Sequence, residues 1–73
     1  MRYFFDTIDQ TGARRDPIGV DCATATAARR LAREALAEMF VDARDGGDAT
    51  LVIAVRDAEG SPVFEGRLVY AER

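Results

Sequence analysis

The sequence predicts an α+β fold, in which an antiparallel sheet of three to four strands carries one helix packed on one face. Three observations support this fold class. Two segments rich in aromatic and β-branched residues each contain a tight-turn signal, as β-hairpins do. One alanine-rich segment with a helical period separates them. The predicted order of elements is therefore β-β-α-β-β, and the chain forms a single domain, residues 1–73.

The turn signal Asp-x-x-Gly occurs three times, beginning at Asp9, Asp16 and Asp57. An aspartate at the first position of a type I turn accepts hydrogen bonds from N–H groups of the turn, and glycine tolerates the positive φ that often follows. We expect strands on either side of these turns, with the second strand continuing beyond its corner at Asp16. The expected strand segments are residues 3–8, 13–15, 20–22, 51–56 and 63–71.

Residues 25–44 have the composition and the period of an amphipathic helix. Thr24 is the expected N-cap, because its hydroxyl can accept a hydrogen bond from the first turn. Gly46 is placed to end the helix in a left-handed conformation. At about 100° per residue, one face of this segment is apolar and must pack on the sheet. The residues of that face are Ala25, Ala28, Leu31, Ala32, Ala35, Leu36, Met39, Phe40 and Ala43.

Strand side chains alternate between the two faces of a sheet, so each strand offers one face to the helix. In the first strand the choice is decided by Asp6, because burying an unpaired carboxylate costs on the order of several kcal/mol. Asp6 therefore points away from the helix. The residues expected to face the helix are Tyr3, Phe5, Leu51, Ile53, Val55, Phe64, Leu68 and Tyr70.

The composition, 48% hydrophobic and 32% charged, is that of a globular protein. The longest unbroken apolar stretch covers only residues 51–55, whereas a membrane-spanning helix needs about 20 residues. Residues 1–6 end in an acid where a signal peptide has its apolar segment. We therefore expect a cytoplasmic protein with no membrane association. The single cysteine, Cys22, excludes an intramolecular disulfide.

A net charge of −3 argues against nucleic acid as a partner, because phosphate neutralisation needs a surplus of cations. All ten cations are arginines. Five of these arginines form the one cationic cluster of the sequence. This cluster is either a solvated surface or a site where forked guanidinium groups bind an anion or an acidic partner. The arginines of this cluster are Arg14, Arg15, Arg29, Arg30 and Arg33.

The side chains of most catalytic constellations are missing from this sequence, which contains no histidine and no lysine. Ser61, which precedes Pro62, is expected to serve a turn. Cys22 is expected to act as a small buried hydrophobe, with a reactive thiolate as the less favoured alternative. The acids Asp42, Asp45 and Asp48 are spaced three apart, which does not match a calcium loop. No catalytic, cofactor or metal site is predicted, and we expect no enzyme.

One helix covers one side of a sheet, so the other side is either solvated or covered by a second copy or another protein. The predicted function is a non-enzymatic interaction module that forms a homo-oligomer through the uncovered face or an edge strand, and an unknown protein partner remains open. The alternative is a small nucleic-acid-associated regulator or an antitoxin-like accessory domain. The apolar residues expected on the uncovered face are Phe4, Ile8, Val52, Val63 and Val69.

Four motifs spread over nearly the whole chain resemble a family of short bacterial proteins. They are residues 2–6 (RYFFD), residues 16–20 (DxxGV), the Ala-Arg-rich segment 27–37, and residues 55–63 (VRDxxGxPV). The family is frequent in rhizobia and other soil- and plant-associated bacteria and is labelled only as a domain of unknown function. Cys22 and Ala23 depart from its pattern before the helix. The resemblance implies a shared small fold and supplies no catalytic residues.

Overall fold

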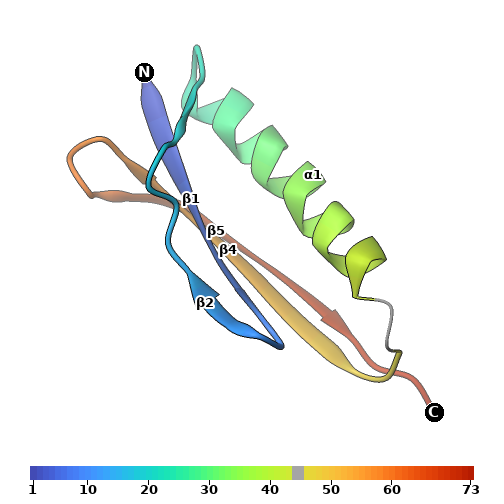
Figure 1. Ribbon diagram of the computed structural model, residues 1–73. Helices are drawn as coiled ribbons and strands as arrows, with labels where there is room; N and C mark the ends of the chain where they lie inside the picture. Colours follow the sequence, from blue (N-terminus) through green and yellow to red (C-terminus); the bar gives the residue numbers. More distant parts are fainter. Residues whose placement is uncertain (44–45) are drawn as a thin grey trace.

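The computed structural model describes residues 1–43 and 46–73 and shows an antiparallel sheet of five strands with one helix across one face (Figure 1). This confirms the predicted α+β class, with the second predicted strand divided into two short ones. The elements in chain order are β1 (Arg2–Asp9), β2 (Gly12–Arg14), β3 (Val20–Asp21), α1 (Ala25–Asp42), β4 (Ala49–Asp57) and β5 (Pro62–Tyr70).

The strand order is β2-β1-β4-β5, and β3 also pairs with β1. The two hairpins therefore join through β1 and β4, which pair from Tyr3 opposite Asp57 to Ile8 opposite Val52. β2 and β3 share one edge of the sheet, and β5 forms the opposite edge (Figure 1).

Asp16 explains why the second strand is interrupted. Its carboxylate oxygen Oδ2 accepts a hydrogen bond of 3.0 Å from the backbone N–H of Phe5, in the gap between β2 and β3. Its Oδ1 accepts from the N–H groups of Ile18 and Gly19. Gly19 has φ +77°, and a Cβ there would lie 2.9 Å from the carbonyl oxygen of Tyr3. A side chain therefore replaces the backbone partner of β1 at this point.

The start of α1 was predicted correctly, and its end was not. The Thr24 hydroxyl accepts a hydrogen bond from the N–H of Ala27 at 3.1 Å, as an N-cap does. The helix ends at Asp42 with Ala43 as its C-cap, and Gly46, which has the predicted positive φ of +73°, lies beyond this end. The N–H of Ala43 bonds to two carbonyls of the last turn, which completes the helix early. The predicted last residue, Arg44, lies outside the described residues.

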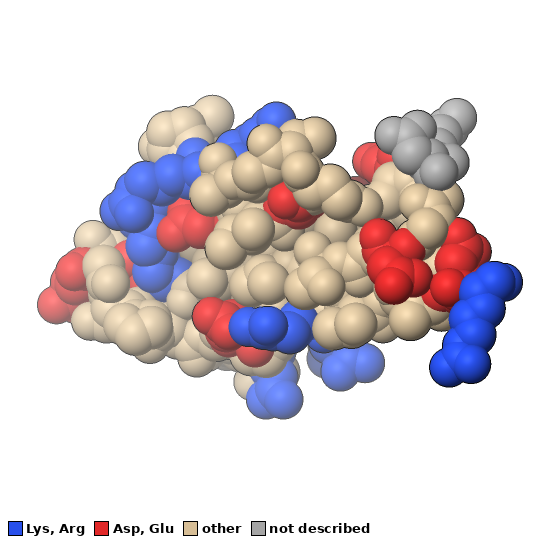
Figure 2. Space-filling view, turned by 90° about the horizontal axis from the view of Figure 1, so that it is seen from below, with Lys and Arg blue, Asp and Glu red and all other residues tan. Residues whose placement is uncertain are grey.

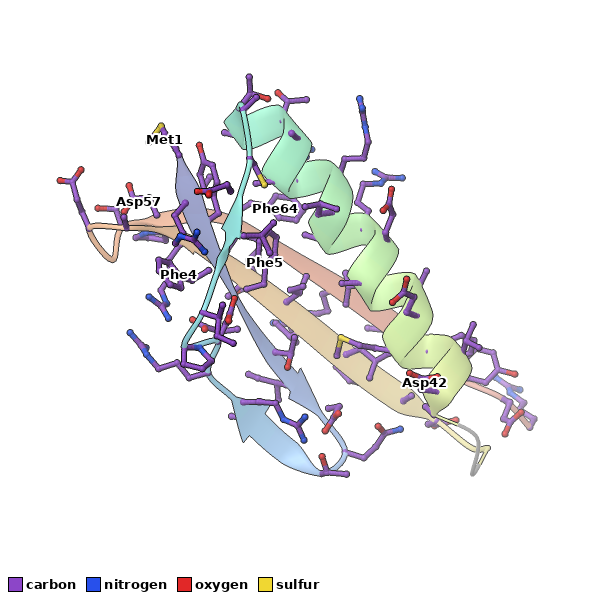
Figure 3. The ribbon with its side chains drawn as sticks, turned by 45° about the horizontal axis from the view of Figure 1, so that its top comes forward. Met1, Phe4, Phe5, Asp42, Asp57 and Phe64 are labelled. Atoms are coloured by element: carbon purple, nitrogen blue, oxygen red, sulfur yellow. The ribbon has the colours of Figure 1, made fainter. Side chains whose placement is uncertain are left out.

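The core lies between α1 and the inner face of the sheet, and the predicted orientation of the strands is confirmed. Figure 3 shows Phe5 and Phe64 directed toward the helix and Phe4 directed away from it. Because the buried helix residues are mostly alanines, the helix lies close to the strands. The buried residues of this cluster are Tyr3, Cys22, Ala28, Ala32, Leu36, Leu51, Ile53 and Val55.

The predicted helical stripe is wider than the surface that the sheet covers. Leu31 was expected in the core but remains 39% exposed, and Ala25 is also exposed. Leu31 borders a hollow beside Cys22 and Ala23, at the margin of the contact. Tyr70 lies near the opposite margin, half exposed, with its ring centroid 4.9 Å from that of Phe40.

Candidate functional site

The sheet face opposite α1, which we call the outer face, mixes charged and apolar side chains. The registers of β1, β4 and β5 and the alternation of side chains place these residues together. Figure 2 shows the same mixing on one side of the molecule, where acidic and basic side chains lie next to each other around an uncharged area. The outer-face residues are Phe4, Asp6, Ile8, Val52, Ala54, Arg56, Val63, Glu65, Arg67 and Val69.

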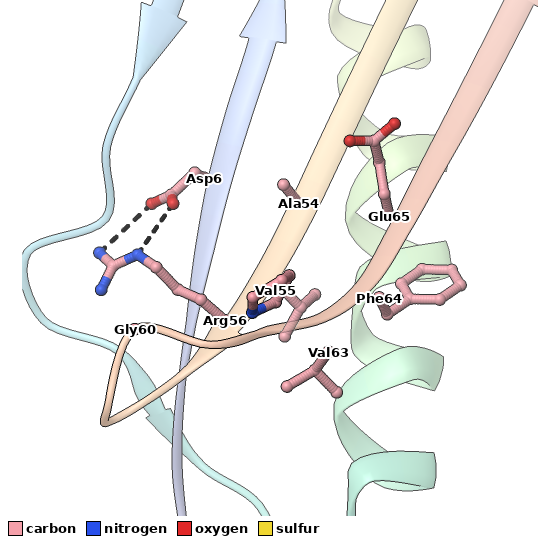
Figure 4. A pocket seen from close by; sticks show the side chains of 9 residues that line it. Asp6, Ala54, Val55, Arg56, Gly60, Val63, Phe64 and Glu65 are labelled. Atoms are coloured by element: carbon pink, nitrogen blue, oxygen red, sulfur yellow. Dashed lines mark hydrogen bonds and ion pairs between the residues drawn. The ribbon is translucent and has the colours of Figure 1, made fainter.

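Arg56 is the centre of a polar network on the outer face. Its Nε lies 2.9 Å from Oδ2 of Asp6 (Figure 4). Its Nη2 donates a hydrogen bond of 2.9 Å to the backbone carbonyl of Asp16. Its guanidinium carbon lies 4.6 Å from the centroid of the Phe4 ring. The side chains of Arg56 and Asp6 are only 18% and 25% exposed. The predicted outward direction of Asp6 is therefore correct, and Arg56 neutralises its charge.

The carboxylates of this network are held in their charged form. The hydrogen bond from Arg56 lowers the pKa of Asp6, against the opposing effect of burial, and the N–H of Asp16 lowers it further. Burial raises the pKa of Asp16, but hydrogen bonds from the N–H groups of Gly19, Phe5 and Ile18 outweigh burial and lower that pKa overall. The network thus fastens the segment after β2 to the sheet.

Two shallow depressions lie on the outer face. One has a volume of about 400 Å³ and is lined by Arg56, Pro62 and Val63 among others (Figure 4). The second, of about 260 Å³, extends toward Arg14 and Arg15 and shares Asp6, Ala54 and Glu65 with the first. Asp6 and Arg56 are paired with each other, and Glu65, the remaining charged group of the first depression, lies 3.7 Å from Arg67. Charged groups that are held in ion pairs are better suited to contact with another protein than to proton transfer in catalysis.

The five predicted interaction residues do not form one continuous apolar patch. Phe4 is half-buried beneath Arg56, and Val52 is half-buried beside Ile8. On β5, Val69 is 67% exposed and Val63 is 38% exposed, but Glu65 and Arg67 lie between them. The exposed apolar residues of the outer face are therefore separated: Val63 and Val69 lie near the two ends of β5, and Ile8, which is 49% exposed, lies on β1.

β5 is the feature that sequence reasoning did not single out. Its nine residues pair with β4 along one side, and over residues 1–43 and 46–73 no strand pairs with its other side. Backbone N–H and C=O groups along a free edge are available to another strand. A hairpin signal in the sequence predicted the strand but could not tell that it lies at an edge.

The five predicted arginines lie on two parts of the molecule. Arg14 and Arg15 lie at the end of β2, at the sheet edge opposite β5. Arg29, Arg30 and Arg33 belong to the first half of α1. Arg29 lies over the Phe64 ring, with its guanidinium carbon 5.2 Å from the ring centroid. These arginines therefore do not form a single anion-binding surface.

The other candidate residues have structural roles. Cys22 is buried in the core, as predicted. Asp42 ends α1, and Asp48 accepts a hydrogen bond from the N–H of Glu72 at 3.0 Å. Asp45 lies outside the described residues. Among the residues that the structure describes, no group of three or more potential metal ligands comes together. Its one described helix is not apolar enough to cross a membrane.

The fold and its surfaces define a small α+β domain whose sheet has one covered face, one ion-paired face and one long free edge. The chain belongs to the family described as "Domain of unknown function (DUF6894)", whose family model matches residues 2–69. This confirms the predicted resemblance to a family labelled as a domain of unknown function. Neither a curated protein nor a solved structure matches the chain.

Proposed function

We propose that this domain is a non-enzymatic interaction module of the cytoplasm that self-associates through the free edge of its sheet. One observation carries the proposal, namely the nine-residue edge strand β5 with no strand on its outer side in the described part of the chain. A long free edge presents a row of unpaired donors and acceptors that another strand can satisfy.

The outer face supports this proposal less well than the edge. Its central charges are already paired within the chain, by the contact of Arg56 with Asp6. Its aromatic residue, Phe4, lies beneath the same arginine. Pairing through the face would require these contacts to be covered or broken, whereas pairing through β5 leaves them intact.

Edge strands commonly carry features that prevent pairing, and β5 has three of them. Pro62 begins the strand, and the register is irregular beside it, between Val55 and Arg56. These two features are confined to the first residues. The third is the pair of exposed charges at Glu65 and Arg67 in the middle of the strand, which have opposite signs. From Phe64 to Tyr70 the register with β4 is regular, so most of the strand is suited to accept a partner.

Sedimentation velocity of the full chain at micromolar concentration tests the proposal. We expect a concentration-dependent equilibrium between monomer and dimer. A strict monomer over the whole range would contradict self-association. The nucleic-acid alternative is tested in parallel by a gel shift, in which a complex that weakens as salt rises would favour it over the proposed module.

A further inference from the structure

We infer that the partner of β5 is β5 of a second copy of this chain, paired antiparallel and centred on Gly66. This inference rests on the proposed self-association and adds the residues and the register of the contact. Its basis is the order of side chains along the strand, which is complementary to itself in the reverse direction. The pairs in this register are Pro62 with Tyr70, Val63 with Val69, Phe64 with Leu68, Glu65 with Arg67, and Gly66 with Gly66.

The charged pair provides the strongest complementarity. Glu65 and Arg67 are neighbours on the outer face, 3.7 Å apart between Oε2 and Nη2, and both side chains are 59% exposed. In the proposed register, each Glu65 lies opposite the Arg67 of the second copy. Four charges of alternating sign then surround the two-fold axis, and opposite charges that face each other across two strands are stabilising.

The apolar residues of β5 match in the same register. Val63 and Val69 are exposed in the single chain, on the outer face near the two ends of the strand. Pairing brings the Val63 of each copy opposite the Val69 of the other, which removes both from water. On the inner face, the half-buried Phe64 and Leu68 meet in the same way and extend the core across the axis.

Gly66 suits the position on the axis. It lies on the inner face below α1, where a Cβ would be 3.0 Å from Cδ1 of Leu36. Because two glycines meet there, β5 itself places no side chain at the axis on the inner face.

Backbone geometry and charge together disfavour the adjacent registers. In an antiparallel pair, residues whose N–H and C=O groups point outward must face residues that do the same. In a pair related by a two-fold axis, one residue must therefore face its own copy across the axis, as Gly66 does here. Moving the axis by one residue places Glu65 opposite Glu65, or Arg67 opposite Arg67, so like charges then face each other. The register centred on Gly66 avoids both repulsions.

The resulting dimer has one continuous sheet, in which both helices lie on the same side. Side chains that face each other across two strands point to the same face, so outer-face residues pair with outer-face residues. The Arg56 network and both depressions remain on the opposite side of this sheet from the helices. The edge formed by β2 and β3 stays free in each copy.

Charge reversal tests the inference, with dimer affinity measured by sedimentation equilibrium. Glu65→Arg alone and Arg67→Glu alone each place like charges opposite each other, and we expect each to weaken dimerisation on the order of tenfold. Mixing the two variants restores opposite charges across the axis and should yield a heterodimer with near wild-type affinity. The matched control is Glu59→Arg, in the exposed turn after β4, which should leave affinity unchanged. Circular dichroism of each variant verifies the fold.

The double variant Glu65→Arg with Arg67→Glu provides a second test, because it reverses every pair and keeps all of them complementary. We expect its dimer to match the wild type. If the wild type dimerises but the single variants are as tight as the control, or if neither mixing nor the double variant restores affinity, the register is wrong while self-association stands. A wild-type chain that stays monomeric would instead overturn the proposed function together with this inference.

Discussion

Arg56 connects three segments that are far apart in the sequence. Its ion pair with Asp6 joins β4 to β1, and its hydrogen bond to the Asp16 carbonyl fastens the segment after β2. The alternation of side chains predicted that Asp6 points outward. Its partner was not predictable, because the register that places Arg56 beside Asp6 joins residues 50 positions apart.

Removing the Arg56 guanidinium leaves Asp6 mostly buried without its partner. We expect Arg56→Gln to lower the free energy of unfolding by about 2 kcal/mol, less than for a fully buried pair because both side chains are partly exposed. Urea unfolding followed by circular dichroism measures the change. Arg30→Gln, on the exposed side of α1, is the matched control and should change stability by no more than about 0.5 kcal/mol. Equal losses in the two variants would contradict the structural role of Arg56.

Acid should destabilise this network, because the pKa values of Asp6 and Asp16 are lowered in the folded chain. The unfolded chain takes up protons at higher pH than the folded chain, so protonation favours unfolding. The stabilisation is complete above the ordinary pKa of 3.8 and is lost as the pH falls through the lowered values. Urea unfolding at a series of pH values tests this. The Asp6→Asn variant should lose less stability on acidification than the wild type. If the stability of the two proteins falls in parallel as the pH is lowered, Asp6 is not a source of the acid sensitivity.

Among the elements, α1 shows what periodicity predicts and what it does not. The period and Thr24 gave the start of the helix and the direction of its buried stripe. They did not give the width of the covered stripe, because that depends on how far the sheet extends beneath the helix. Leu31 lies beyond that limit and is exposed. The early end at Asp42 depends on hydrogen bonds of Ala43 that no sequence signal marks.

The segment between β2 and β3 depends on Gly19 for close contact with β1. Gly19→Ala adds a Cβ that lies 2.9 Å from the Tyr3 carbonyl and 2.9 Å from Cε2 of Phe4, at φ +77°. We expect a loss of about 2 to 4 kcal/mol in the free energy of unfolding, from backbone strain and steric overlap together. Thermal and urea unfolding measure it.

Gly60→Ala is the matched control for this substitution. Gly60 also has a positive φ, +86°, but a Cβ there meets nothing within 4 Å. The free energy of unfolding of Gly60→Ala should fall by about 1 to 2 kcal/mol, from backbone strain alone. A loss at Gly60 as large as that at Gly19 would show that contact with β1 does not constrain the segment.

For the molecule as a whole, the strand order determines the functional interpretation. The sequence predicted two hairpins and one helix, but the order β2-β1-β4-β5 depends on pairing between the hairpins and has no local signal. The reversed complementarity of residues 62–70 is visible in the sequence. It indicates a contact between copies only when β5 is known to be an edge strand. For this reason, the outer face rather than the edge supplied the candidate residues from sequence alone.

Amide hydrogen exchange across a dilution series tests the edge pairing most directly, because it reports on single backbone groups of β5. At high concentration, we expect slow exchange for alternate amides between residues 63 and 69, those that point away from β4. On dilution these amides should become fast, while the amides of β5 bonded to β4 stay slow. Outward amides that exchange rapidly at every concentration, or a concentration dependence confined to β2 and β3, would contradict association through β5.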